Sequence, residues 1–97
     1  MKKASGPQNA THFEQIPNVG PATAGDFREL GITKPQQLVG QDAFKLYERL
    51  CKKTKTTHDP CVIDVFLAAI AFMETGDSRP WWEHTADRKN RLRNKDV

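Results

Sequence analysis

The fold of this chain is decided by the stretch Ile16-Pro17-Asn18-Val19-Gly20-Pro21-Ala22-Thr23-Ala24. Pro17 ends the preceding helix, because its ring removes a backbone donor and disfavours the α region for the residue before it. Asn18 and Gly20 both tolerate positive φ, so the chain can turn sharply while Val19 enters the core between two helices. Pro21 suits the first position of a new helix. The stretch therefore predicts a tight corner between two helices.

The start of the helix at Pro21 is a candidate anion site. The first N–H groups of a helix have no intrahelical acceptor, and they point toward whatever lies in front of the helix. Such a helix start binds anions, above all phosphate. Nucleic acid is therefore the first partner to consider. The structural alternative is a corner that uses Gly20 and Pro21 only to build the core.

Length and composition predict one small domain. The chain has 97 residues, 37% of them hydrophobic, and a domain of this size buries roughly 60–65% of its unfolded surface. No run of 18 or more apolar residues occurs, and no apolar stretch follows the first lysines, so we expect neither a membrane span nor a signal peptide. Two cysteines suit a reducing compartment. A cytoplasmic protein is the expectation.

The charge favours polyanions as partners. The formal net charge is +3 and the pI is about 9.0. Positive charge gathers at both ends and in one central loop, at Lys2, Lys3, Lys52, Lys53, Lys55, Arg88, Lys89, Arg91, Arg93 and Lys95. Such clusters favour nucleic acid. The alternative is a solvated surface that keeps the protein soluble.

The helical patterns predict an all-α fold of five to six short helices. We interpret residues 1–9 as a flexible tail, 10–94 as one helical domain and 95–97 as a frayed end. The expected helices begin near Thr11, Pro21, Thr33, Asp42, Asp59 and Thr85, with glycines at 31, 40 and 76 as terminators. We expect Leu38 and Val39 to face inward, and Leu92 to face inward from the last helix, whose basic residues face outward.

The segment from Val62 to Met73 is apolar on nearly every side. Such a helix is buried all round, so we expect residues 60–75 to form the central helix. Its excess apolar surface is also a candidate homodimer face. We expect Trp81 and Trp82 to pack against this helix, with base stacking as the alternative. Asp64, buried within it, should be paired with a tryptophan N–H or a helix start.

These motifs together resemble the small bacterial helix-hairpin-helix proteins of the pathogenicity-locus or mitomycin-resistance family. The resemblance covers about Phe13 to Arg93. Its motifs are the stretch quoted above and then Leu30-Gly31-Ile32, Leu46-Tyr47-Glu48-Arg49-Leu50-Cys51, His58-Asp59-Pro60-Cys61-Val62, Asp64-Val65-Phe66 and Pro80-Trp81-Trp82. The order of hairpin, apolar helix and tryptophan segment is also similar to the C-terminal domain of TfoX competence regulators, a more distant relation.

The resemblance implies a SAM-like domain built around one helix-hairpin-helix unit. In helix-hairpin-helix proteins at large, backbone N–H groups of the hairpin and of the following helix start bind DNA phosphates without reading bases, and the matching positions here are Val19, Gly20, Ala22 and Thr23. Two departures occur: Asn18 replaces the first hairpin glycine, and Ala22 stands where DNA binders often carry lysine. The chain has a single hairpin, so one copy cannot grip both strands of a duplex. Nearby cations are expected from Arg28, Lys52, Lys53 and Lys55.

Metal and catalytic sites are disfavoured. Cys51, His58 and Cys61 have a spacing that suggests zinc, but structural zinc needs four ligands in tight pairs, and we interpret the cysteines as small residues at helix ends. No nucleophile motif or P-loop occurs. We therefore expect no cofactor, no metal and no enzymatic activity.

The sequence thus predicts a non-enzymatic module that binds DNA weakly and without sequence preference. The alternative is a SAM-like protein-interaction module, with a homodimer through the apolar helix 60–75 as one form.

Overall fold

The computed structural model describes the backbone of residues 2–95 and the side chains of that range other than those of Asp87 and residues 92–95. Every regular element in residues 2–95 is helical, so the all-α prediction is confirmed. The elements are η1 (Pro7–Asn9), η2 (Phe13–Gln15), α1 (Pro21–Glu29), η3 (Pro35–Leu38), α2 (Ala43–Thr54), α3 (Cys61–Thr75), η4 (Trp81–His84) and α4 (Thr85–Lys95). Four are α-helices, against the five to six predicted, and four are short 3₁₀ helices.

The two predicted helices that shorten to 3₁₀ turns are those at η2 and η3. Both are closely bounded, because Pro17 follows η2 and Gly40, at φ 82°, follows η3. At η2 the side-chain oxygen of Gln15 accepts from the backbone N–H groups of Thr11 and His12. A 3₁₀ turn satisfies its donors over only three or four residues. The chain before α1 is therefore a tight turn rather than a full α-helix.

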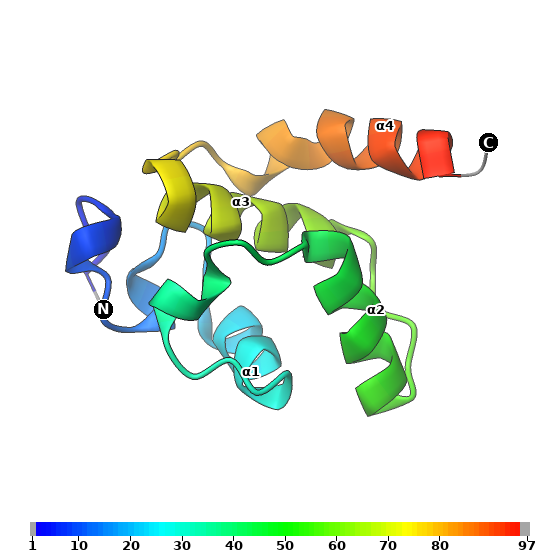
Figure 1. The fold of residues 1–97 in the computed structure, drawn as a ribbon, viewed down its shortest axis with the longest axis horizontal. Helices are drawn as coiled ribbons and strands as arrows, with labels where there is room; N and C mark the ends of the chain where they lie inside the picture. The colour runs from blue at the N-terminus through cyan, green and yellow to red at the C-terminus, as the bar shows by residue number, and fades with distance from the viewer. Residues whose placement is uncertain (1, 96–97) are drawn as a thin grey trace.

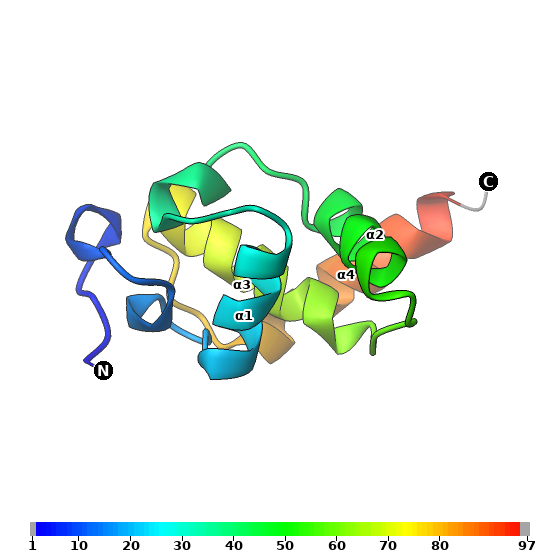
Figure 2. The ribbon, with the colours of Figure 1, turned by 90° about the horizontal axis from the view of Figure 1, so that it is seen from below.

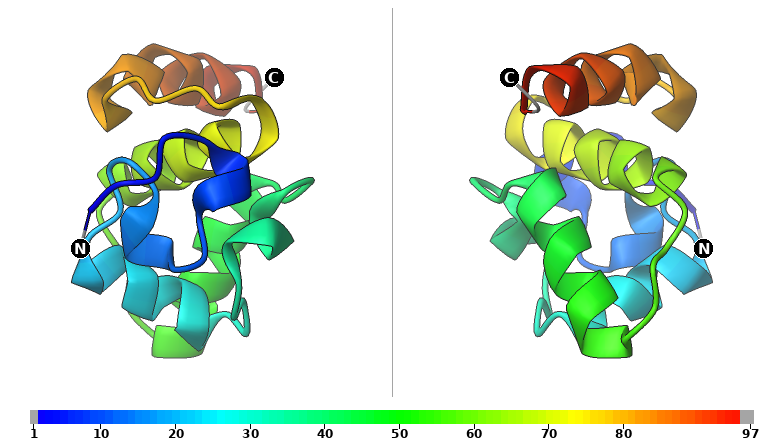
Figure 3. Two further views of the ribbon diagram at one scale, coloured as in Figure 1. Left: turned by 90° about the vertical axis from the view of Figure 1, so that its left-hand side faces the viewer. Right: turned by 90° about the vertical axis from the view of Figure 1, so that its right-hand side faces the viewer.

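The helices form three layers with α3 in the middle (Figure 1). Helix α4 covers one side of α3, and α1 and α2 lie together on the other side (Figures 2 and 3). No residue of α3 from 61 to 73 is exposed. The prediction of a buried central helix is confirmed. Because this chain covers α3 by itself, little apolar surface of that helix is open for a dimer contact.

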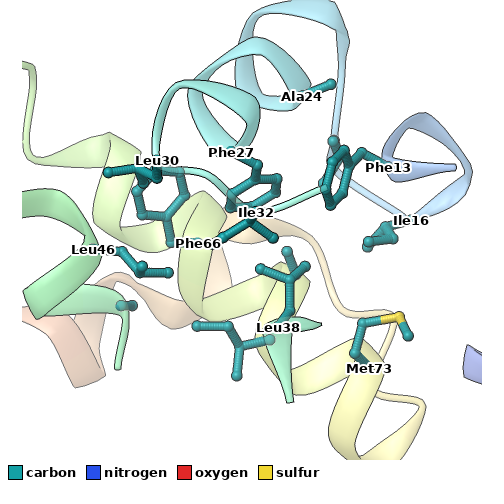
Figure 4. Packing of buried hydrophobic residues seen from close by; sticks show 14 of the residues in the cluster. Phe13, Ile16, Ala24, Phe27, Leu30, Ile32, Leu38, Leu46, Phe66 and Met73 are labelled. Carbon is teal, nitrogen blue, oxygen red and sulfur yellow. The ribbon is translucent and has the colours of Figure 1, made fainter. Parts of the chain in front are cut away.

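The core joins the turn before α1 to the central helix. The Phe27 ring lies between those of Phe13 and Phe66, with centroid separations of 5.1 Å on each side, as Figure 4 shows. Val19 is buried at 1% exposure, as predicted. Offset aromatic contacts of this kind contribute beyond the apolar area they bury. The segment before the corner and α1 are thus joined to α3 through three contacting aromatic rings.

Several helix boundaries follow the predicted signals. Asp42 accepts from the N–H of Phe44 over 2.9 Å at the start of α2, and Asp59 accepts from the N–H of Cys61 over 2.8 Å at the start of α3. Gly31 and Gly76 adopt φ of 82° and 79° at the ends of α1 and α3. Only glycine takes this left-handed region without a steric cost.

Two predicted core residues are exposed instead. Val39 is 54% exposed, because η3 ends at Leu38, which takes the buried position, and the chain then becomes extended. Trp82 is 60% exposed, so only Trp81 is partly buried. The prediction that both tryptophans pack against the central helix is therefore wrong for Trp82. The prediction for the Leu92 side chain lies outside the described residues.

The buried carboxylate of Asp64 is paired, as predicted, and its partners lie in the first turn of α4 rather than on a tryptophan. It accepts from the Thr85 hydroxyl over 2.8 Å and from the Arg88 guanidinium over 2.7 Å. Both residues belong to α4, so this pair ties α4 to α3. Arg88 consequently points inward, with a side chain only 12% exposed. The prediction that the basic residues of the last helix all face outward is wrong at this position.

The N-terminal segment contacts the domain. The N–H of Ala4 donates to the carbonyl of Gln15 over 2.8 Å, and Ala4 packs against the core. The flexibility of residues 1–9 stays a prediction. Met1, and residues 96–97 of the predicted frayed end, lie outside the described residues. Among the described helices, none combines the length and apolar character needed to cross a membrane.

Candidate nucleic-acid interface

The turn before α1 uses one residue in a left-handed conformation. Asn18 adopts φ 74°, whereas Gly20 adopts φ −105° and ψ −173°, the extended conformation usual for a residue that precedes a helix. The sequence allowed positive φ at both positions. Gly20 does not need it, because Pro21 begins α1 directly and the turn is completed at Asn18.

The side chain of Asn18 also fastens the tryptophan segment. Its Nδ2 donates to the carbonyl of Arg79 over 2.9 Å, and its Oδ1 accepts from the N–H of Trp81 over 3.1 Å. The segment before η4 therefore passes beside the turn before α1 (Figure 2). Glycine at position 18 would permit the same turn but would make neither contact. Asn18 therefore has a structural role beyond its positive φ.

Three of the four N–H groups expected to face phosphate are open. The N–H of Val19 donates to the carbonyl of Ile16 over 3.1 Å, so it is occupied within the turn. No described residue accepts from the N–H groups of Gly20, Ala22 or Thr23. A Cβ built on Gly20 would meet nothing within 4 Å. The space in front of α1 can therefore admit an anion.

Lys3 supplies a cation to this turn, which sequence reasoning missed. Its ammonium donates to the carbonyls of Glu14, Ile16 and Val19 over 2.9, 3.2 and 2.8 Å. The charge is thereby held at the turn before α1, on the carbonyl side of the peptide bond between Val19 and Gly20. A lysine in a polar N-terminal tail carries no local signal for such a role, because the contact spans 11 to 16 residues.

The predicted cations lie along α1 and at its far end rather than around its start. Arg28 is exposed, with its guanidinium carbon 5.7 Å from the centroid of the Phe13 ring. Lys53 donates to the carbonyl of Glu29, and Arg49 donates to that of Leu30 over 3.1 Å. Both therefore cap the C-terminal end of α1, where cations are favoured by the helix dipole.

The lysines at the C-terminal end of α2 are thus separated from the open N–H groups by the length of α1. The nine residues of α1 are separated by eight rises of about 1.5 Å, so its two ends lie about 12 Å apart. Lys52 and Lys55 are exposed beside Lys53, and Lys55 ends α2 at φ 55°. The predicted residues consequently form two groups joined by α1: Gly20, Ala22 and Thr23 with Lys3, and Lys52, Lys53 and Lys55.

The three zinc candidates serve the loop between α2 and α3. The Cys51 sulfur accepts from the N–H of His58 over 3.5 Å, and the Thr54 hydroxyl contacts the Nε2 of His58 over 2.9 Å. A hydrogen bond to Asp59 raises the pKa of the Cys61 thiol, which disfavours the thiolate that a metal requires. No group of three or more His, Cys, Asp or Glu residues within the described range is arranged to hold a metal.

Comparison with known proteins identifies relatives. A profile of the pathogenicity locus family matches residues 7–90. The mitomycin resistance protein McrB of Streptomyces lavendulae is 39% identical over 75 residues, which cover 77% of this chain and 71% of that protein. No solved structure matches. The more distant similarity to TfoX regulators stays a prediction.

The matched region contains the turn before α1, the central helix and the tryptophan segment, and so includes most of the residues that carry the resemblance seen in the sequence. The predicted family is confirmed by both the profile and the Streptomyces relative. This chain belongs to the pathogenicity locus family.

Proposed function

We propose that this chain is a cytoplasmic, non-enzymatic helix-hairpin-helix module of SAM-like type that binds nucleic acid weakly and without sequence preference. One observation carries the proposal. The N–H groups of Gly20, Ala22 and Thr23 have no described acceptor, and the Lys3 ammonium binds the carbonyl of Val19 in the same turn.

The physical basis is the charge at the start of α1. Open N–H groups and the helix dipole favour an anion at this end, and the Lys3 ammonium adds a full positive charge. Phosphate is the anion that nucleic acid presents at every nucleotide. Contacts of this kind position a protein on the backbone but do not read bases, which is why no sequence preference is expected.

The second group of cations extends the interface along the same strand. About 12 Å separates the two ends of α1, which corresponds to roughly three or four nucleotides at 3.4 Å of rise each. Arg28 lies in the last turn of α1, at the end that carries the second group. A strand that runs along α1 would therefore meet the open N–H groups first and the cluster Lys52, Lys53 and Lys55 last.

A salt titration tests the proposal. We expect labelled DNA of two unrelated sequences to bind equally, with a log–log slope against salt between about −2 and −4 if two to four phosphates are neutralised. Ala22→Glu places a carboxylate in the first turn of α1, which favours the helix but repels phosphate. It should weaken binding at least about tenfold, or 1.4 kcal/mol.

Gln41→Glu is the matched control, because it changes the charge by the same amount at an exposed position before α2. It should leave affinity within about twofold. The absence of binding at low salt, or equal losses for Ala22→Glu and Gln41→Glu, would rule out a phosphate site at α1.

The alternative is a protein-interaction module. A groove of about 300 Å³ between α2 and α4 favours it, and its lining residues are Asp42, Phe44, Lys45, Glu48 and Arg91. The Arg91 guanidinium lies 4.2 Å from the centroid of the Phe44 ring. A homodimer through α3 is less favoured, because residues 61–73 are covered within one chain. Sedimentation of the wild type and Phe44→Ala, with and without DNA, would show whether the chain self-associates and whether that association depends on Phe44 in the groove.

The name of the Streptomyces relative associates that protein with mitomycin resistance. We extend this association to the present chain as part of the proposal. Growth of a mitomycin-sensitive bacterium that expresses the wild-type chain or Ala22→Glu would measure it. Protection by the wild type alone is the expected result, whereas equal protection would separate resistance from the phosphate site.

A further inference from the structure

One large aromatic side chain, that of Trp82, is open to solvent, and it follows Trp81, whose backbone N–H binds Asn18 in the turn before α1. Among the described side chains, the exposed large hydrophobics are Val39 at 54% and Trp82 at 60%. An indole has a large planar π face that can stack on another planar group. Val39 offers no such face, so the two positions differ in the kind of ligand they suit.

The Trp82 ring belongs to a segment that is hydrogen-bonded to Asn18. It meets the Trp81 ring edge-to-face, with centroids 5.8 Å apart and planes at 83°. Because the rings are not stacked in parallel, Trp81 leaves at least one face of Trp82 uncovered. The backbone of Trp81 is itself fixed, since its N–H donates to Asn18 over 3.1 Å. The indole is thereby presented from a 3₁₀ turn whose position is set by the hairpin.

The same asparagine connects this indole to the phosphate site. Asn18 contacts the tryptophan segment through its side chain, and two residues later Gly20 presents its open N–H group. The Lys3 ammonium binds the carbonyl between them, that of Val19. The backbone next to the exposed indole is thus tied to the turn that carries the open N–H groups. Proteins that bind single strands combine phosphate contacts with aromatic faces in this way.

We propose that Trp82 stacks on an unpaired nucleobase of the strand whose phosphate lies at the start of α1, so that the ligand is single-stranded nucleic acid rather than a duplex. This inference rests on the proposed function. In a duplex the base faces are covered by neighbouring bases, so an indole can reach them only at ends, gaps or single strands. Stacking is tolerant of sequence because every base has a π face.

An abasic oligonucleotide separates stacking from phosphate binding. Fluorescence anisotropy would compare labelled oligothymidine with an abasic strand of the same length, which keeps the phosphates but has no bases. We expect the wild type to bind oligothymidine roughly 5- to 150-fold more tightly than the abasic strand. Trp82→Ala should lose this difference and bind both strands alike, whereas Trp82→Phe should retain part of it.

Val39→Ala is the matched control, because it removes the other exposed large hydrophobic and should leave both affinities unchanged. Thermal melting by circular dichroism checks that each variant is folded. In Trp81→Phe the indole of Trp82 is the sole tryptophan, and its fluorescence should be quenched by oligothymidine but not by the abasic strand. Oligouridine in place of oligothymidine should behave alike if the base face is what is recognised.

The outcomes distinguish the two proposals. Equal wild-type affinity for oligothymidine and the abasic strand, with no effect of Trp82→Ala, would overturn stacking and leave the phosphate site intact. Oligothymidine binding that depends on Trp82, together with no abasic binding and no effect of Ala22→Glu, would support stacking and overturn the phosphate site. Binding to neither strand at low salt would overturn both.

Discussion

The N–H of Trp81 donates to the side-chain oxygen of Asn18 over 3.1 Å, across 63 residues of sequence. The nitrogen of the same amide donates to the carbonyl of Arg79 over 2.9 Å. One side chain therefore closes the turn before α1 and holds the segment that presents Trp82. Two properties of Asn18 are combined here, its tolerance of positive φ and its paired donor and acceptor.

Substitution of Asn18 separates these two properties. Asn18→Gly keeps the left-handed turn but removes both hydrogen bonds, and should lower the free energy of unfolding by about 1–2 kcal/mol. Asn18→Ala should cost roughly 1–2 kcal/mol more, because alanine is strained at φ 74°. Denaturant unfolding measures both. Asn9→Ala is the control, since Asn9 hydrogen bonds only locally to Ser5; an unchanged stability of Asn18→Gly would contradict a structural role for the contacts.

Removal of the Lys3 ammonium should affect both the turn and the ligand. In Lys3→Met the carbonyls of Glu14, Ile16 and Val19 lose a shared donor, and stability should fall by about 1–2 kcal/mol. The salt slope of nucleic-acid binding should become shallower by about 1. Lys2→Met removes the same charge from an exposed neighbouring position and should leave the stability unchanged. Equal stabilities of the two variants would show that the turn does not depend on Lys3.

Loss of the buried ion pair Asp64–Arg88, between α3 and α4, should lower the free energy of unfolding much more than loss of the more exposed pair Asp77–Arg79. Asp64→Ala leaves the Arg88 guanidinium, 12% exposed, without its carboxylate, and should cost about 3–5 kcal/mol. The double variant Asp64→Asn with Arg88→Met removes both charges and should recover much of that loss. For the exposed pair Arg79–Asp77, Asp77→Asn should cost less than about 1 kcal/mol. Calorimetric unfolding compares the three variants, and similar losses in all would contradict the difference in burial.

The carboxyl group of Asp77 should make stability depend weakly on acid pH. Hydrogen bonds from the side chain and then the backbone of Arg79 lower the pKa of Asp77 below its usual 3.8. A lowered folded-state pKa means that the contribution is present above the unfolded pKa and is lost as the pH falls through the folded value. The wild type should therefore lose stability relative to Asp77→Asn below about pH 4. Thermal melting of the two proteins from neutral to acid pH measures this. A difference in melting temperature that stays constant across the pH range would contradict the prediction.

Local signals predicted most helix boundaries correctly because they act within a few residues. Asp42 and Asp59 accept from N–H groups two residues later, and Gly76 ends α3 from the next position. The composition of α3 also predicted its burial, since a helix apolar on every side must be covered. The exposed positions of Val39 and Trp82 were predicted wrongly, because hydrophobic character alone does not say which side chains the available surface will cover.

The candidate site was only partly predictable for the same reason. The open N–H groups of Gly20, Ala22 and Thr23 follow from the local pattern of turn and proline. The positions of the cations do not follow from it. Lys3 binds a carbonyl in the turn that is 16 residues away in the sequence, and Lys53 binds a carbonyl at the opposite end of α1 that is 24 residues away. Charge counted along the sequence therefore overstated how many lysines surround the helix start.

By itself, the stretch from Ile16 to Ala24 determined a sharp turn, a buried Val19 and a helix that begins at Pro21, because proline, asparagine and glycine restrict the backbone locally. The tertiary structure alone decided what surrounds that turn. It held Lys3 at its carbonyls, fastened Trp81 to Asn18 and left Trp82 exposed beside it. Those contacts depend on how three layers of helices pack, and no spacing within the sequence specifies that arrangement.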